Sequence, residues 1–157
     1  LRRTVAGYLL TDSTRVSCPA ADLSVEPDVV FISDQSLYCG RVRLVPKEEA
    51  QPDRYVEVDG PPDLIVEIVS DSSVTKDTQR LPTAYYQAGV PEFWLMDARG
   101  EHLIYEIFRR GQSAYEAVPS DVDVFKYSSV FDCQLMLTRQ RNSKGRWAFR
   151  LLEQPDA

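Results

Sequence analysis

The sequence predicts a fold of the α/β or α+β class, in which a mixed β-sheet carries one crossover helix and β-hairpins follow at the C-terminal end. Two apolar runs, 29–32 and 64–69, have the length and composition of buried strands. A third run, 92–97, follows a segment with helical signals, and this strand–helix–strand order is typical of two parallel neighbouring strands. We therefore expect 63–70 and 92–97 to be parallel, joined by a helix within 71–88.

Residues 1–10 and 33–60 are expected to lie at the periphery of this sheet. Residues 1–10 have the pattern of a helix end that runs into a strand. The segment 33–60 is polar and contains prolines and a glycine, which are typical of turns. It predicts a surface excursion with short strands at 41–45 and 55–58.

The crossover segment carries conflicting helix signals. Serines near its start can cap a helix, and Gly89 suits a helix C-terminus. Pro82 lies inside the segment and has no backbone N–H to donate. The helix is therefore expected either to begin near Thr78 or to bend at Leu81.

The last third predicts two hairpins, because pairs of strand-like runs flank turn residues. The expected strands are 102–108 with 114–118, and 131–139 with 147–152. Exposed strand edges and the aromatic residues Phe131, Trp147 and Phe149 are typical of an interface, so we expect these hairpins to form a homodimer.

Length and composition predict one domain over residues 1–157. The chain begins with Leu1 instead of Met, so we expect the native protein to have a further N-terminal segment. No apolar run approaches the ~18 residues that a membrane span requires. The three cysteines are widely spaced, which indicates free thiols and a cytoplasmic location.

The net charge of −6 argues against a strongly basic nucleic-acid-binding surface. It does not exclude a local one, because six cationic residues gather late in the chain: Arg109, Arg110, Arg139, Arg141, Lys144 and Arg146.

Two acids in the strongest strand are the candidate functional residues. Glu67 lies inside the apolar run and Asp63 begins it, and a buried carboxylate needs a cation or hydrogen bonds. At ~3.3 Å per residue the two are roughly 13 Å apart, too far to share a metal ion directly. Asp28 begins the other acid-led strand and is the better partner for Glu67. Two carboxylates suit Mg²⁺ or Mn²⁺.

Cations on the following helix could complete such a site. Lys76 and Arg80 are spaced i, i+4, and Asp77 steps with the apolar face of the helix. Each residue also has a structural interpretation: Asp63 and Asp28 as turn residues before strands, and Lys76 as a solvated helix charge. Glu67 in mid-strand is the hardest to explain without a function.

Three motifs resemble those of the Uma-type restriction-endonuclease family, in the PD-(D/E)-x-K nuclease-like superfamily. They are PDVVFI, PPDLIVEIVSDSS and YYQAGVPEFWLMD, in order over about residues 22–110. The resemblance implies a restriction-endonuclease-like mixed sheet flanked by helices and a Mg²⁺-dependent phosphodiesterase site. By position, Asp28 and Glu67 match the motif acids. The family's helix lysine falls at Leu81, so Lys76 or Arg80 would have to replace it.

Two functions follow as hypotheses. The first is a metal-dependent DNA endonuclease, with Asp28 and Glu67 as metal ligands and Lys76 as the cation. Asp63, Asp77 and Arg80 are supporting or alternative residues. The second is a catalytically degenerate nuclease-fold domain that acts in binding or assembly, because Leu81 replaces the lysine. Action on RNA is not separated from the first by sequence.

Overall fold

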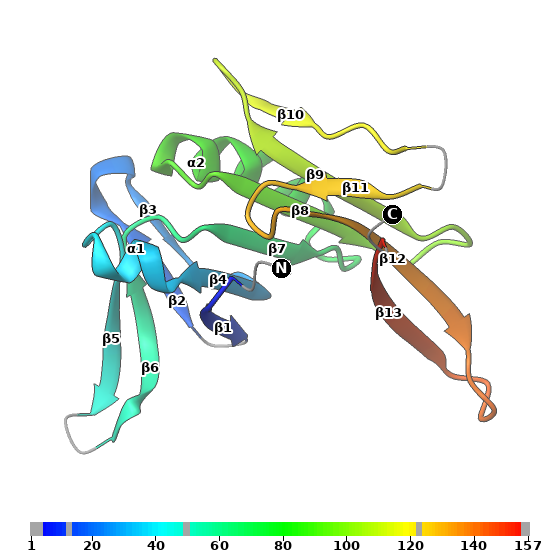
Figure 1. Ribbon diagram of the computed structural model, residues 1–157, viewed down its shortest axis with the longest axis horizontal. Coiled ribbons are helices and arrows are strands. Elements are labelled where there is room, and N and C mark those ends of the chain that lie inside the picture. The colour runs from blue at the N-terminus through cyan, green and yellow to red at the C-terminus, as the bar shows by residue number, and fades with distance from the viewer. Residues whose placement is uncertain (1–4, 12–13, 49–50, 122–123, 155–157) are drawn as a thin grey trace.

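The computed structural model describes residues 5–11, 14–48, 51–121 and 124–154. Its centre is a six-stranded mixed sheet with the order β1-β4-β7-β8-β9-β10 (Figure 1). These strands are β1 (Gly7–Thr11), β4 (Val29–Ser33), β7 (Leu64–Ile68), β8 (Glu92–Asp97), β9 (Ile104–Arg110) and β10 (Tyr115–Ala117). The α+β class is as predicted, and β8 has the predicted bounds.

The predicted parallel pair is confirmed. Strands β7 and β8 run parallel with Ile65 opposite Phe93, whereas β4 pairs with the other side of β7 in antiparallel fashion. The helix α2 (Leu81–Ala88) crosses between β7 and β8, and Gly89 ends it in the left-handed conformation. The start of β4 therefore lies at the same end of the sheet as the C-terminal ends of β7 and β8.

The helical segment includes Pro82 by means of a π-helical turn that the sequence did not predict. A helical turn begins at Val74, and Lys76–Arg80 form a π-helical turn (η2) before α2. The N–H of Leu81 donates to the carbonyl of Lys76, five residues back. The expected start near Thr78 is wrong, because the helix begins four residues earlier; at Leu81, where a bend was the alternative, the π-helical turn gives way to α2.

Two smaller sheets flank the central one. The first has the order β3-β2-β6-β5 and the second β11-β12-β13. Their strands are β2 (Arg15–Cys18), β3 (Leu23–Val25), β5 (Arg43–Glu48), β6 (Gln51–Asp59), β11 (Lys126–Ser128), β12 (Cys133–Arg141) and β13 (Trp147–Glu153). Both predicted C-terminal hairpins and the two strands within 33–60 are present. The sequence did not predict β2, β3, β11, the 3₁₀ turn η1 (Pro19–Ala21) or the helix α1 (Asp34–Tyr38).

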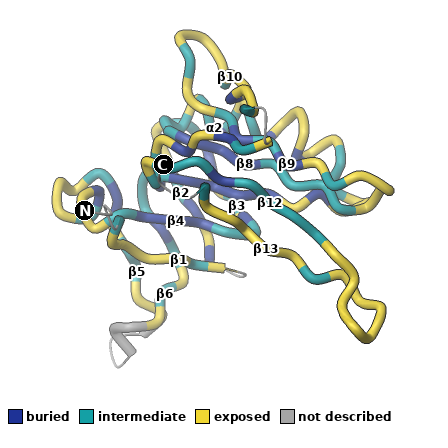
Figure 2. Tube along the Cα trace, turned by 45° about the vertical axis from the view of Figure 1, so that its right-hand side comes forward, coloured by how far each residue is buried: buried dark blue, intermediate teal, exposed yellow. Residues whose placement is uncertain are grey.

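The core consists of two clusters of buried side chains. The central strands contain many of the buried positions, dark blue in Figure 2. Strand alternation directs Ile65 towards α2 and its Tyr85, while Leu64 and Val66 face the opposite cluster with Trp94. Glu67 therefore shares the α2 face with Ile65. Burial of these apolar side chains stabilises the fold at about 25 cal/mol per Å² removed from water.

Phe131 belongs to this core and not to an exposed interface. Its ring lies 5.0 Å from the ring of Phe31 and 5.9 Å from that of Trp94, centroid to centroid. By contrast, Trp147 and Phe149 are exposed on the β12–β13 hairpin, which projects from the molecule as β5–β6 does (Figures 1 and 2). None of the described helices is both long and apolar enough to cross a membrane.

Candidate functional site

Glu67 lies near the end of β7 with its side chain under α2. Only 3% of the residue is exposed. The hydroxyl of Tyr85, from the middle of α2, donates a hydrogen bond to Oε1 of Glu67. The crossover helix thus supplies the hydrogen-bond partner that a buried carboxylate requires.

Asp28 lies beside Glu67 because of the β4–β7 register. Val29 pairs with Val66 in antiparallel fashion, so the preceding residue of β4 is opposite the following residue of β7. Oδ2 of Asp28 accepts a hydrogen bond of 2.6 Å from the backbone N–H of Ile68. Two carboxylates from neighbouring strands therefore meet where β4 begins and β7 ends.

Asp77 adds a third acid from the π-helical turn. It is 2% exposed, and the hydroxyl of Ser73 donates to its Oδ2. Its backbone N–H bonds to the carbonyl of Ser73 at 2.8 Å. Asp77 thus lies on the buried face of the helix together with Leu81 and Tyr85, as the helical spacing predicted.

The surroundings raise the pKa of Glu67 to about 7. Burial is the main cause, and the negative charges of Asp28 and Asp77 add to it. The hydrogen bond from Tyr85 and the positive charge of Lys76 act in the opposite direction. Burial and the charge of Glu67 also raise the pKa of Tyr85, which keeps its hydroxyl a donor.

Lys76 is exposed at the margin of this cluster. It lines a cavity of about 390 Å³ together with Arg15, Ser24, Val25 and Glu26. Arg15 comes from β2, a strand that the sequence did not predict, so its place here was missed. The cavity brings two cations to the side of the acidic cluster.

Arg80 and Leu81, the other two helix positions considered for the cation, do not line this cavity. Arg80 is exposed. Leu81 is buried and packs in the main core with Ile65, Tyr85 and Val90. The structure thus gives Leu81 a packing role at the position where the family motif has its lysine.

Asp63 makes contacts of another kind. It accepts hydrogen bonds from the N–H of Ser33 at 2.7 Å and from the hydroxyl of Ser36 at 2.9 Å. It also forms an ion pair with Arg41. Ser33 caps α1, so Asp63 holds this helix at the start of β7. These contacts explain why an acid occupies the strand entry.

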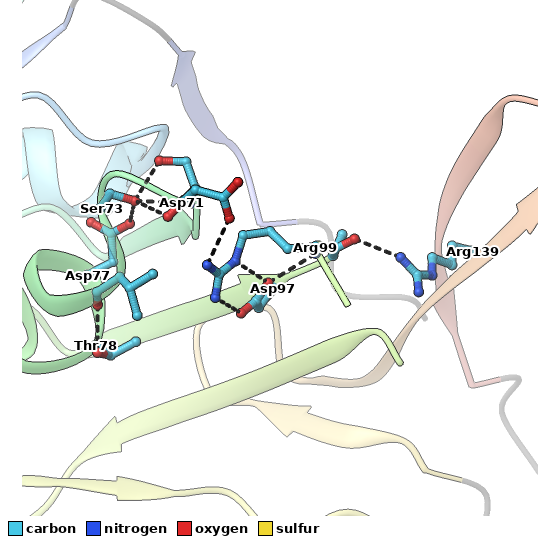
Figure 3. Close-up of polar contacts among 10 residues, drawn as sticks. Asp71, Ser73, Asp77, Thr78, Asp97, Arg99 and Arg139 are labelled. Carbon is cyan, nitrogen blue, oxygen red and sulfur yellow. Dashed lines mark hydrogen bonds and ion pairs between the residues drawn. The ribbon is translucent and has the colours of Figure 1, made fainter. Parts of the chain in front are cut away.

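A polar network at the C-terminal ends of β7 and β8, on the side of Glu67, was not predicted (Figure 3). Arg99, in the turn after β8, donates to Asp97 at 2.8 Å and to Asp71 at 3.1 Å. Arg139 of β12 donates to the carbonyl of Ala98 at 2.8 Å. The network connects the loops after β7 and β8 with the β12–β13 hairpin.

Glu92 is a second buried glutamate that sequence reasoning missed. It is fully buried at the start of β8 and accepts hydrogen bonds of 2.6–2.7 Å from Trp94 Nε1, the hydroxyls of Ser128 and Ser129, and the N–H of Ser129. A longer bond of 3.3 Å comes from the N–H of Val130. Glu92 fastens the β11–β12 connection to the sheet.

The donor set of the Glu67 cluster suits a hard divalent cation. Carboxylate oxygens are the ligands that Mg²⁺ prefers, and this ion commonly takes one or two carboxylates with water and phosphate oxygens. Repulsion among Glu67, Asp28 and Asp77 is a charge imbalance that such an ion would offset. No group of three or more acid, histidine or cysteine side chains within the described ranges is spaced to hold a metal ion by itself.

Comparisons with known proteins agree with the fold. The sequence model of the Uma2 family, described as "Putative restriction endonuclease", matches residues 1–140. The chain is also similar to the crystal structure of "a putative nuclease belonging to DUF820" from Anabaena variabilis. The TM-score is 0.52 at 18% identity, over 80% of this chain and 62% of that one. This likeness confirms the predicted nuclease-like fold, and this chain spans less than two thirds of that neighbour. A search of curated proteins gave no match.

Proposed function

The chain belongs to the Uma2 family, and on this premise we propose that it is a metal-dependent endonuclease that hydrolyses phosphodiester bonds in DNA. The observation that carries the proposal is the meeting of Asp28 and Glu67 across the β4–β7 register, beside Lys76. A buried acid that faces other acids is costly to the fold, and such placement is typical of functional sites.

Glu67 and Asp28 would hold a Mg²⁺ or Mn²⁺ ion. Such an ion, when bound, polarises the phosphate and lowers the pKa of a bound water. The hydrogen bond from Tyr85 fixes the orientation of the Glu67 carboxylate. The negative charge of Asp77 raises the pKa of Glu67, and the hydroxyl of Ser73 donates a hydrogen bond to the Asp77 carboxylate.

The cavity beside the acids supplies the substrate contacts. The ammonium of Lys76 would stabilise the negative charge that develops on the phosphate oxygens during attack. The guanidinium of Arg15, which lines the same cavity, would bind a neighbouring phosphate with its fork of donors. In this proposal the two cations of the cavity bind the substrate, and the acids of the cluster bind the metal ion.

Cleavage of plasmid and linear duplex DNA with Mg²⁺ or Mn²⁺ tests the proposal. We expect Glu67→Ala and Asp28→Ala to lower the cleavage rate at least about a hundredfold, because each removes a metal ligand. Glu116→Ala, which removes an exposed glutamate on β10, serves as the matched control and should leave the rate unchanged. Full activity of Glu67→Ala would exclude the assigned role.

The second candidate is a nuclease-fold domain that binds without cutting. The burial of Leu81 at the lysine position favours it, because a core leucine supplies no positive charge. The same assay decides between the two. A wild-type protein that cuts neither DNA nor RNA with either metal supports binding alone. A Lys76→Ala variant that loses the wild-type cleavage supports the enzyme.

A further inference from the structure

The two hairpins that project from the molecule differ in charge. Residues 133–153, which form β12–β13, contain five cationic side chains and one acid, a net charge of +4. The remainder of the chain therefore carries −10, since the total is −6. Residues 43–59 of the β5–β6 hairpin contain three cationic side chains and five acids, a net charge of −2. Positive charge is thus concentrated on one projecting ribbon.

We propose that the β12–β13 hairpin is the element that grips duplex DNA, by insertion of its basic tip into a groove. This inference rests on the proposed function, because it assigns a substrate-binding surface to the same enzyme. A two-stranded β-ribbon fits the major groove of B-DNA, which is about 12 Å wide. Ribbons of this kind are known readers of the groove.

Two arginines stiffen the ribbon. Arg139 and Arg141 lie on one face, opposite Phe149 and Trp147 in the register. Their guanidinium groups lie 4.4 and 4.3 Å from the centre of the Trp147 ring, one cation–π contact each. Arg141 also donates to the carbonyl of Gly145 in the turn. These contacts hold the exposed hairpin in a defined shape.

Arg139, close to the turn of the ribbon, ties the ribbon to the loop after β8. Arg139 donates to the carbonyls of Ala98, Gly100 and Glu101 at 2.8, 2.7 and 2.6 Å. These residues belong to the loop after β8, at the sheet edge where Glu67 lies on the neighbouring β7. Figure 3 shows Arg139 reaching this loop, which also carries Arg99. DNA held by the ribbon would therefore lie against the edge that carries the acids.

Because Arg139 and Arg141 make contacts within the protein, the cations available to bind DNA are other residues at or near the tip. The side-chain oxygen of Asn142 accepts hydrogen bonds from the N–H groups of Lys144 and Arg146 at 2.9 and 3.0 Å, which shapes the turn. Lys144, Arg146 and Arg150 are exposed, and within the described residues none forms an ion pair. Phosphate groups are the ligands that suit such side chains.

Charge also argues against a second copy of the chain as the occupant. Trp147 and Phe149 are 45% and 48% exposed, which alone would suit a protein interface. A twofold dimer through this face would bring two ribbons of +4 together, whereas the DNA backbone has the complementary sign. A-form RNA is a poorer fit, because its major groove is deep and narrow.

Binding of a fluorescent duplex DNA in metal-free buffer, over a salt series, tests the proposal. The variant Lys144→Ala/Arg146→Ala should bind at least about tenfold more weakly. The slope of log K against log salt should fall by about 2, since each phosphate contact contributes ~0.9. The control Lys47→Ala/Arg109→Ala makes the same charge change at exposed positions on β5 and β9 and should retain most of the affinity.

Equal binding by the tip variant and the control would overturn the proposal, as would a wild type that does not bind duplex DNA. Preferred binding of duplex RNA, or a wild-type dimer that the tip variant dissolves in sedimentation, would also overturn it. A cleavage assay with Mg²⁺ tests the proposed endonuclease activity separately from DNA binding by the ribbon. Tip-dependent binding without cleavage contradicts only the proposed activity, and cleavage that is independent of the tip contradicts only the ribbon.

Discussion

The two buried glutamates of the central sheet have opposite surroundings. Glu92, on β8, accepts hydrogen bonds from five donors of Trp94 and residues 128–130. Glu67, on β7, has one hydrogen bond from a described residue, the hydroxyl of Tyr85. The strands are neighbours, and the side chains lie on opposite faces of the sheet because their strand positions differ by an odd number in the β7–β8 register.

The difference separates a structural acid from a candidate functional one. Donors around Glu92 replace the water that burial removes, so its carboxylate can serve as a fixed anchor. Around Glu67, burial and then the negative charges of Asp28 and Asp77 raise the pKa to about 7. A carboxylate with unfilled bonding capacity and repelling neighbours is prepared for a cation.

The largest expected effect comes from removing the anchor. Glu92→Ala leaves five donors without their acceptor and opens a cavity, which should lower the free energy of unfolding by about 3–5 kcal/mol. Urea unfolding measures it. A loss below about 1 kcal/mol would mean that water replaces the carboxylate easily, and the contrast between the two glutamates would then be wrong.

The next effect has the opposite sign. In metal-free buffer, Glu67→Gln should raise the free energy of unfolding at pH 8 by about 3 kcal/mol, because the amide needs no ionisation. Between pH 4.5 and 7 the unfolded chain has lost the Glu67 proton while the folded protein retains it, so wild-type stability falls as pH rises through this window.

The control for this prediction is pH itself. Below pH 4.5 the carboxyl is neutral in both states, so Glu67→Gln and wild type should be equally stable there. Thermal or urea unfolding at several pH values with EDTA measures the difference. A glutamine variant that is less stable than wild type at pH 8 would show that the cluster carries no electrostatic cost.

Sequence reasoning reached the acid pair because its signals are local. An apolar run fixes which face of a strand Glu67 occupies, and the acid-led strand at Asp28 marks the neighbour. It did not reach Arg15, which comes from a short strand of four residues with little periodicity. Glu92 was missed for another reason: its partners lie 36–38 residues away, on a turn that no local pattern ties to β8.

The helix shows the same limit. Pro82 signalled a disturbance, but the choice among a late start, a bend and a π-helical turn depends on tertiary contacts. Asp77 and Tyr85 both reach the buried face across the wide turn, each with a polar partner. Both side chains are buried, and Tyr85 bonds Glu67 of β7, contacts between distant segments that local helix signals do not encode.

The smallest expected effect concerns the one hydrogen bond that Glu67 receives. Tyr85→Phe removes it and keeps the ring in the core, so the cost should be about 1 kcal/mol. Because this bond favours the charged form, its loss should move the pKa of Glu67 above 7, and the decline of stability with pH should shift to higher pH. Asp28→Asn is the opposing control: it removes a like charge, so the pKa of Glu67 should fall. NMR titration of the Glu67 side chain with EDTA measures both shifts. If both variants moved the pKa in the same direction, the hydrogen bond and the charge would not be separate influences on Glu67.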